Sequence, residues 1–160
     1  MSASPSTPGY SPNEVADRLA IQDLLTRYAV AIDTKDWTLL DTVFTPDATL
    51  DYESSGGPRA PYPDARAWLA RVLEPMVMTQ HILGNVTIEL DGDSARSRAY
   101  YYNPMGAGAP DEEDGMLLFF NGGYYTDRLT RTAAGWRITE RVEEMAWIQG
   151  WPRPKPGEYL

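Results

Sequence analysis

Long runs of strand-forming residues, paired around turn signals, fill the second half of the chain, and they constrain the fold more than any other feature. Asp91-Gly92-Asp93 and Thr132-Ala133-Ala134-Gly135 are typical of turns that join antiparallel strands. Each turn is flanked by two such runs, which predicts strands over residues 81–90, 95–102, 116–130 and 136–147. We therefore expect two hairpins within one antiparallel sheet.

The first half of the chain has helical periodicity instead. Ser11-Pro12-Asn13-Glu14 combines an N-cap, a proline suited to the first helical position and a capping-box glutamate. The helix that starts there is expected to run to about Asp33, with an apolar stripe formed by Ile21, Leu25, Tyr28, Ala29 and Ile32. The remaining expected elements are a helix over 36–44 ended by Pro46, a strand over 48–52, a loop over 53–63 and a helix over 64–73.

The order of these elements, helices followed by a long antiparallel meander, predicts an α+β fold in which the helices cover one face of a curved sheet. We expect residues 1–10 to be a disordered lead-in and residues 11–150 to form a single domain. Residues 151–160 are expected to be a proline-rich tail without regular structure. Residues 103–115, with acidic side chains at 111–114, are expected to form a solvated loop.

Composition excludes several classes of function. The chain of 160 residues has no cysteine and one histidine, so disulfides, thiolate nucleophiles and cysteine-ligated zinc are excluded, and no metal site is expected. The net charge of −9 argues against a nucleic-acid or anionic-membrane partner. No apolar run approaches the roughly 20 residues of a membrane span, and the N-terminus lacks signal-peptide features, so a soluble cytoplasmic protein is expected.

The single histidine, His81, opens the first predicted strand, and its ordinary pKa near neutrality makes it the main candidate for proton transfer. Asp33 and Tyr28 lie at opposite edges of the apolar stripe of the first helix. A carboxylate there could accept the Nδ1–H of the imidazole and fix its tautomer. Structural alternatives stay open at this point: a hydrogen-bonded histidine at a strand start, a solvent-facing aspartate and a core tyrosine.

Four stretches, distributed over roughly residues 15–145, carry a family resemblance. They are residues 20–28 followed by Asp33, residues 37–44 with Pro46-Asp47-Ala48, Thr79-Gln80-His81, and Gly135-Trp136-Arg137-Ile138. Together they resemble the SnoaL-like branch of the NTF2-like superfamily. Within it, the chain is most similar to the scytalone dehydratase-like enzymes, which include bile-acid 7α-dehydratases and hexachlorocyclohexane dehydrochlorinases. The resemblance implies a cone-shaped α+β barrel, no metal or organic cofactor, and a homo-oligomer, usually a trimer, with a dimer as the alternative.

The resemblance also implies roles for individual residues. Asp33 and His81, which are 48 positions apart, match the catalytic Asp–His dyad of the family. Tyr28 matches a pocket tyrosine of the dehydratases and is expected to assist catalysis. Tyr52 and Arg141 stand at positions expected to contact the substrate, Tyr52 as a polarising hydroxyl and Arg141 as a pocket cation.

Two of the expected contacts depend on which face of a strand a side chain occupies. The chain lacks the second histidine of the fungal scytalone dehydratase pattern, and Tyr100 stands in that region as a substrate-binding candidate. Successive strand residues point to opposite faces, so only part of the tyrosine run 100–102 can line a pocket. The face of Arg141 depends on register and bulges, and a surface network with the glutamates at 140, 143 and 144 is its alternative.

These residues favour a cofactor-independent lyase that eliminates water or another leaving group from a small hydrophobic cyclic substrate, or catalyses the reverse hydration. His81 would be the general base and Asp33 would orient it. An isomerase or polyketide-type cyclase that uses the same base is one alternative. A non-catalytic small-molecule-binding domain is another, because one fold can host unrelated functions.

Overall fold

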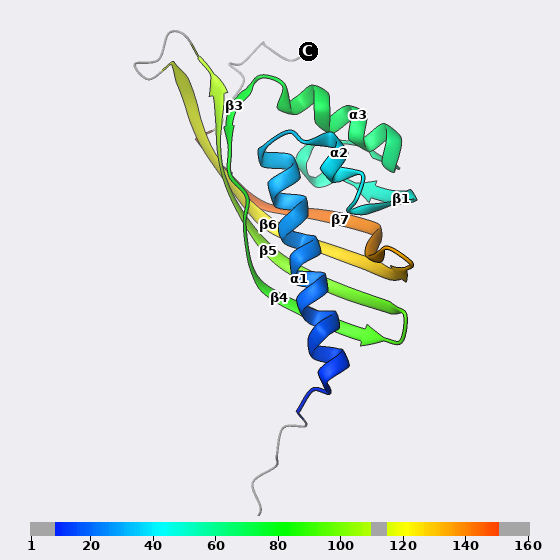
Figure 1. Ribbon diagram of the computed structural model, residues 1–160. Helices are drawn as coiled ribbons and strands as arrows, with labels where there is room; N and C mark the ends of the chain where they lie inside the picture. Colours follow the sequence, from blue (N-terminus) through cyan, green and yellow to red (C-terminus); the bar gives the residue numbers. More distant parts are fainter. Residues whose placement is uncertain (1–8, 110–114, 151–160) are drawn as a thin grey trace, which may run out of the picture.

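The computed structural model describes residues 9–109 and 115–150, and within them the helices lie on one face of a single seven-stranded sheet (Figure 1). The helical elements are α1 (Pro12–Asp33), α2 (Trp37–Leu40), the 3-10 helix η1 (Glu53–Ser55) and α3 (Tyr62–Leu73). The strands are β1 (Phe44–Asp51), β2 (Arg59–Pro61), β3 (Met76–Thr79), β4 (Ile82–Asp91), β5 (Ser94–Gly108), β6 (Met116–Thr132) and β7 (Gly135–Gln149).

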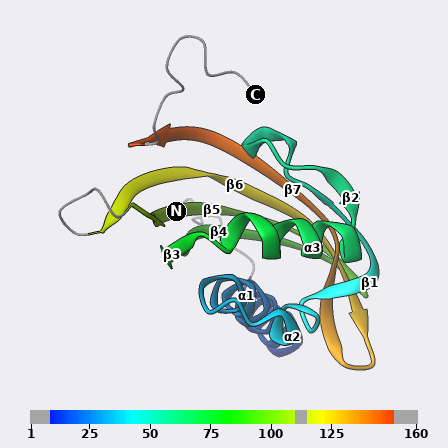
Figure 2. The ribbon, with the colours of Figure 1, turned by 90° about the horizontal axis from the view of Figure 1, so that it is seen from above.

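The strand order is β2-β1-β7-β6-β5-β3, and β4 also pairs with β5. β1 runs parallel to β7, and every other pairing is antiparallel. Seen from above, the long strands β5, β6 and β7 bend around α1 and α3, which lie on the concave side (Figure 2). The predicted α+β fold, with N-terminal helices on a curved and mostly antiparallel sheet, is confirmed.

The start of α1 is built as the sequence predicts. The Glu14 backbone N–H donates to Ser11 Oγ at 3.3 Å, and the Ser11 N–H donates to Glu14 Oε2 at 2.8 Å, which completes the capping box. The buried residues of α1 follow helical spacing and include all five residues of the predicted stripe. They are Ile21, Leu24, Leu25, Tyr28, Ala29, Ala31 and Ile32. None of the helices in the described ranges is long and apolar enough to cross a membrane.

Several predicted boundaries are wrong. The second helix ends at Leu40, and Pro46 lies inside β1, where the register with β7 is interrupted between Phe44 and Thr49. A proline is tolerated there because that stretch has no regular ladder to which it must donate. The predicted loop over 53–63 contains η1 and β2, and α3 starts at Tyr62. The acidic run 111–114, the first eight residues and the tail 151–160 lie outside the described residues.

β5 and β3 differ most from the prediction. β5 continues past residue 102 to Gly108, because β6 pairs with it along its whole length, including Asn103 with Asn121. β3 was not predicted, and it pairs with the same end of β5. β3 and β4 are thus two successive segments along β5, separated by a break at Gln80 and His81.

A bulge in β7 determines which side chains face the helices. Arg128 pairs with Glu140 whereas Leu129 pairs with Ile138, so β7 has one extra residue, Thr139, at this point. Because of that residue, Trp136 and Ile138 before the bulge and Arg141 and Glu143 after it are all buried.

Candidate active site

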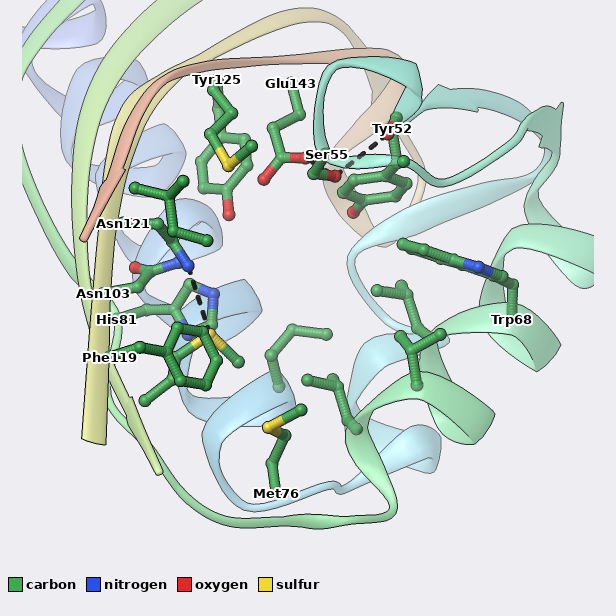
Figure 3. Close-up of a pocket in the computed structure, with 18 of the residues that line it drawn as sticks. Tyr52, Ser55, Trp68, Met76, His81, Asn103, Phe119, Asn121, Tyr125 and Glu143 are labelled. Atoms are coloured by element: carbon green, nitrogen blue, oxygen red, sulfur yellow. Dashed lines mark hydrogen bonds between the residues drawn. The ribbon is translucent and has the colours of Figure 1, made fainter. Parts of the chain in front are cut away.

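A cavity of about 530 Å³ lies between the helices and the concave face of the sheet (Figure 3). Most of its lining is apolar and comes from α1, α3 and the ends of β5, β6 and β7. The polar groups that reach it are few: Tyr28, Tyr52, Ser55, His81, Asn103, Asn121, Tyr125 and Glu143. A largely apolar cavity with a few convergent polar groups is typical of small-molecule sites.

Asp33 and His81, predicted as a pair, are joined by two hydrogen bonds. The last residue of α1, Asp33, lies beside the break between β3 and β4, where the His81 backbone N–H donates to Asp33 Oδ2 at 2.8 Å. His81 Nδ1 lies 2.6 Å from Asp33 Oδ1. Asp33 therefore selects the tautomer with hydrogen on Nδ1 and leaves Nε2 as the basic nitrogen. The side chains are 6% and 22% exposed, so bulk water competes little for this contact.

Tyr28 and Tyr52 form a buried hydroxyl pair beside this dyad. Their hydroxyl oxygens are 3.0 Å apart, and the Tyr28 ring meets the His81 ring edge-on at a centroid distance of 6.2 Å. Burial raises the pKa of both phenols above the ordinary value, although the Arg141 cation partly offsets the rise. Both hydroxyls therefore stay protonated at neutral pH. One hydroxyl hydrogen joins the pair, and the Tyr125 hydroxyl is a further hydrogen-bond partner of Tyr28.

Arg141 is fully buried but does not line the cavity. Its Nε and Nη2 donate to Asp127 Oδ1 and Oδ2 at 2.7 and 2.8 Å, and both side chains are 0% exposed. Its guanidinium lies 3.9 Å from the Tyr28 ring centre and 4.4 Å from that of Tyr125. Burial lowers the pKa of Arg141, but the Asp127 carboxylate outweighs it and the net pKa is raised. The expected direct contact with substrate is therefore corrected: Arg141 supports the tyrosine rings from behind.

Tyr100 also lies away from the cavity. It is 48% exposed and meets Tyr124 edge-on at 4.9 Å on the convex face of the sheet. The alternation of β5 buries Tyr101 instead, together with Asn103 and Met105. The expectation that Tyr100 contacts substrate is corrected on this ground.

Sequence reasoning missed the amide pair Asn103 and Asn121. They are cross-strand neighbours on β5 and β6, and both line the cavity. Asn103 Oδ1 is buried without a hydrogen-bond partner, and Asn121 Nδ2 donates only to the weak acceptor Met105 Sδ at 3.4 Å. The pair therefore has unused capacity for a polar ligand group. The signal was the alternation of β5, which continues past residue 102.

Glu143 is the other missed residue, because the sequence offered it only as a surface partner of Arg141. Glu143 is buried at 9% exposure and lines the cavity, and its Oε2 is hydrogen-bonded to Ser55 Oγ. Burial raises the pKa of Glu143, although the Ser55 hydrogen bond partly offsets the rise. The titratable groups around this carboxyl are Tyr28, Tyr52, His81, Tyr101, Tyr125 and Arg141.

The raised pKa of Glu143 gives a stability prediction. The folded chain keeps this proton at pH values where the unfolded chain has lost it, so native stability falls as pH rises from the ordinary value of 4.5 through the folded-state pKa. Glu143→Gln has no such loss, so its stability should improve relative to the native protein over that window. Urea unfolding at several pH values measures the difference, with the exposed Glu144→Gln as the matched control. A pH-independent difference would contradict the raised pKa.

The described part of the chain contains no cluster of three or more His, Cys, Asp or Glu side chains placed to hold a metal ion.

Comparison with known proteins gives the context for this geometry. An uncharacterized protein of Mycobacterium tuberculosis is 44% identical over 130 residues, which cover 81% of this chain and 86% of the relative. A solved structure from Novosphingobium aromaticivorans, named provisionally as an aromatic ring hydroxylase, is 31% identical with a TM-score of 0.76 and coverage of 89% and 96%.

Two further solved structures share the fold at lower identity. A type 2 hexachlorocyclohexane dehydrochlorinase, LinA, is 22% identical, with a TM-score of 0.73 and coverage of 91% of this chain and 97% of that one. A protein of Novosphingobium aromaticivorans named provisionally as a scytalone dehydratase is 17% identical, with a TM-score of 0.74 and coverage of 88% and 91%. The SnoaL-like domain family itself matches residues 13–142, and with the fold and the relatives this shows that the chain belongs to the SnoaL-like family.

Proposed function

We propose that this protein is a cofactor-independent lyase that eliminates water or another leaving group from a small, mostly apolar cyclic substrate. The observation that carries the proposal is the Asp33–His81 pair, which leaves Nε2 as the basic nitrogen at the wall of an apolar cavity. The fold shared with a dehydrochlorinase and with a provisionally named dehydratase supports the same class of reaction.

In the mechanism proposed for a ketone substrate, His81 Nε2 takes a proton from the carbon next to the carbonyl group. Asp33, which accepts from Nδ1, stabilises the imidazolium that forms. The electron pair moves to the carbonyl oxygen, and the Tyr28–Tyr52 pair donates a hydroxyl hydrogen to that oxyanion. The enolate then expels the leaving group from the next carbon and forms the double bond.

The cavity favours an uncharged substrate. Within residues 9–109 and 115–150, no lysine or arginine lines the cavity. Arg141 is already paired with Asp127 behind Tyr28. The flat faces of Trp68, stacked on Tyr52 at 5.4 Å, and of Phe119 suit a ring. The amides of Asn103 and Asn121 can bind a second polar group of such a molecule.

Product analysis tests the reaction class. The protein would be incubated separately with 3-hydroxycyclohexanone and with hexachlorocyclohexane, in the presence of a chelator and without added cofactor. The masses of the products would be measured by mass spectrometry. Loss of water or of hydrogen chloride, above the level given by His81→Ala, is the expected result. A product of unchanged mass would replace the lyase by an isomerase or cyclase, and turnover equal to that of His81→Ala would favour a binding domain.

A further inference from the structure

The carboxyl group of Glu143 and the ring of His81 border the same cavity from different parts of the sheet. Figure 3 shows Glu143 beside Ser55 and Tyr125 at one end of the cavity, with His81 along the neighbouring wall. Glu143 forms no salt bridge within the residues that the structure describes. The nearby guanidinium of Arg141 is bound on two nitrogens by Asp127. A buried carboxyl without a cation partner favours its neutral form.

A proton on Glu143 also fits the hydrogen bonds of Ser55. Ser55 Oγ lies within hydrogen-bond distance of two acceptors, the Tyr52 carbonyl oxygen at 3.0 Å and Glu143 Oε2. A hydroxyl has one hydrogen and can donate to only one of them at a time. Both contacts are satisfied together if Glu143 holds a proton and donates it to Ser55 Oγ while Ser55 donates to Tyr52.

The carboxyl group is one of two links between the neighbouring segment η1 and β7. Ser54 already joins η1 to β7, because its Oγ donates to the Glu143 carbonyl oxygen at 2.8 Å and accepts from the Met145 N–H at 2.9 Å. An apolar side chain at residue 143 would satisfy those backbone bonds equally well. The buried acid therefore calls for a role in the cavity.

We propose that Glu143 is the general acid of this site, which protonates the leaving group while His81 acts as the base. The inference rests on the proposed lyase function. His81 Nε2 takes the proton from carbon, the carbon–oxygen bond breaks, and the departing hydroxyl takes the proton of Glu143 and leaves as water. His81 then holds a proton that Glu143 lacks, and transfer between them through solvent restores the starting state.

Two probes that give the same product separate the acid from the base. Elimination from 3-acetoxycyclohexanone and elimination from 3-hydroxycyclohexanone give the same product, 2-cyclohexenone. The rate of either reaction is followed by the ultraviolet absorbance of this product. Acetate leaves as a stable anion and needs no acid, whereas hydroxide must be protonated as it leaves. Glu143→Gln should therefore lose about 10²-fold or more in rate with the hydroxy ketone and lose far less with the acetate.

Each outcome of this comparison has its own meaning. Glu144→Gln, the same change on the exposed neighbour, should keep both rates, and thermal unfolding checks that each variant is folded. Equal losses with both probes in Glu143→Gln, or no loss with either, would overturn the assignment of Glu143 and leave His81 as the base. If the native protein were no faster than His81→Ala on the acetate, the proposed lyase function itself would fail.

Discussion

Replacing His81 by alanine should lower the rate of elimination from 3-acetoxycyclohexanone by about 10² to 10⁴-fold, the contribution expected of a positioned general base. The loss is expected because the described cavity lining offers no other imidazole, and the carboxyl group in that lining, Glu143, is assigned above as the acid. Stopped-flow or steady-state absorbance of the enone product measures the rate.

Two aspartate variants of α1 serve as a matched pair for this experiment. Asp33→Asn should also lose much of the rate, because an amide at residue 33 no longer selects the Nδ1–H tautomer or stabilises the imidazolium. Asp23→Asn makes the same change on the exposed side of the same helix and should keep the native rate. A full native rate in His81→Ala would show that the proton is removed elsewhere.

The buried ion pair behind the tyrosines should have the largest effect on stability. Asp127→Asn leaves the Arg141 guanidinium at 0% exposure without its countercharge, and one Arg141 nitrogen, Nη1, already lacks a partner. Breaking a buried pair from one side typically costs about 3 to 5 kcal/mol, because the remaining charge is left desolvated. Urea unfolding of the native protein and the variant measures this free energy of unfolding.

The control is a partly exposed ion pair that joins the same two strands, β6 and β7. Glu140 contacts Arg128 at 2.8 Å with the two side chains 34% and 59% exposed, so Glu140→Gln should cost less than about 1 kcal/mol. A similar small cost in Asp127→Asn would mean that Arg141 finds water or another acceptor, and its role behind Tyr28 would have to be revised.

The parts of the fold that the sequence predicted correctly are those with strong local signals. The capping box at Ser11 placed the start of α1, and the turns at 91–93 and 132–135 placed the two hairpins. The contact between Asp33 and His81 was also predicted correctly, from the family resemblance. These features depend on residues close in sequence or on a distributed family pattern.

The wrong assignments depend on pairings between distant residues. The extra residue Thr139 shifts Arg141 to the concave face, and no local signal marks that bulge. The end of β5 is set by its pairing with β6, and this brings Asn103 into the cavity in place of the predicted loop. Even if the face of Arg141 had been predicted correctly, the sequence could not show that its guanidinium is paired with Asp127 and so does not reach the cavity.

Exchange of the α-hydrogens of cyclohexanone in D₂O, followed by nuclear magnetic resonance, is the most direct test of the central claim that His81 abstracts a proton from carbon. Cyclohexanone has no leaving group, so the exchange reports the base independently of any acid and of the fate of the enolate. The native protein should exchange these hydrogens faster than buffer, and His81→Ala should fall to the buffer rate. Equal exchange by the native protein and His81→Ala would contradict the assignment of His81 as the base.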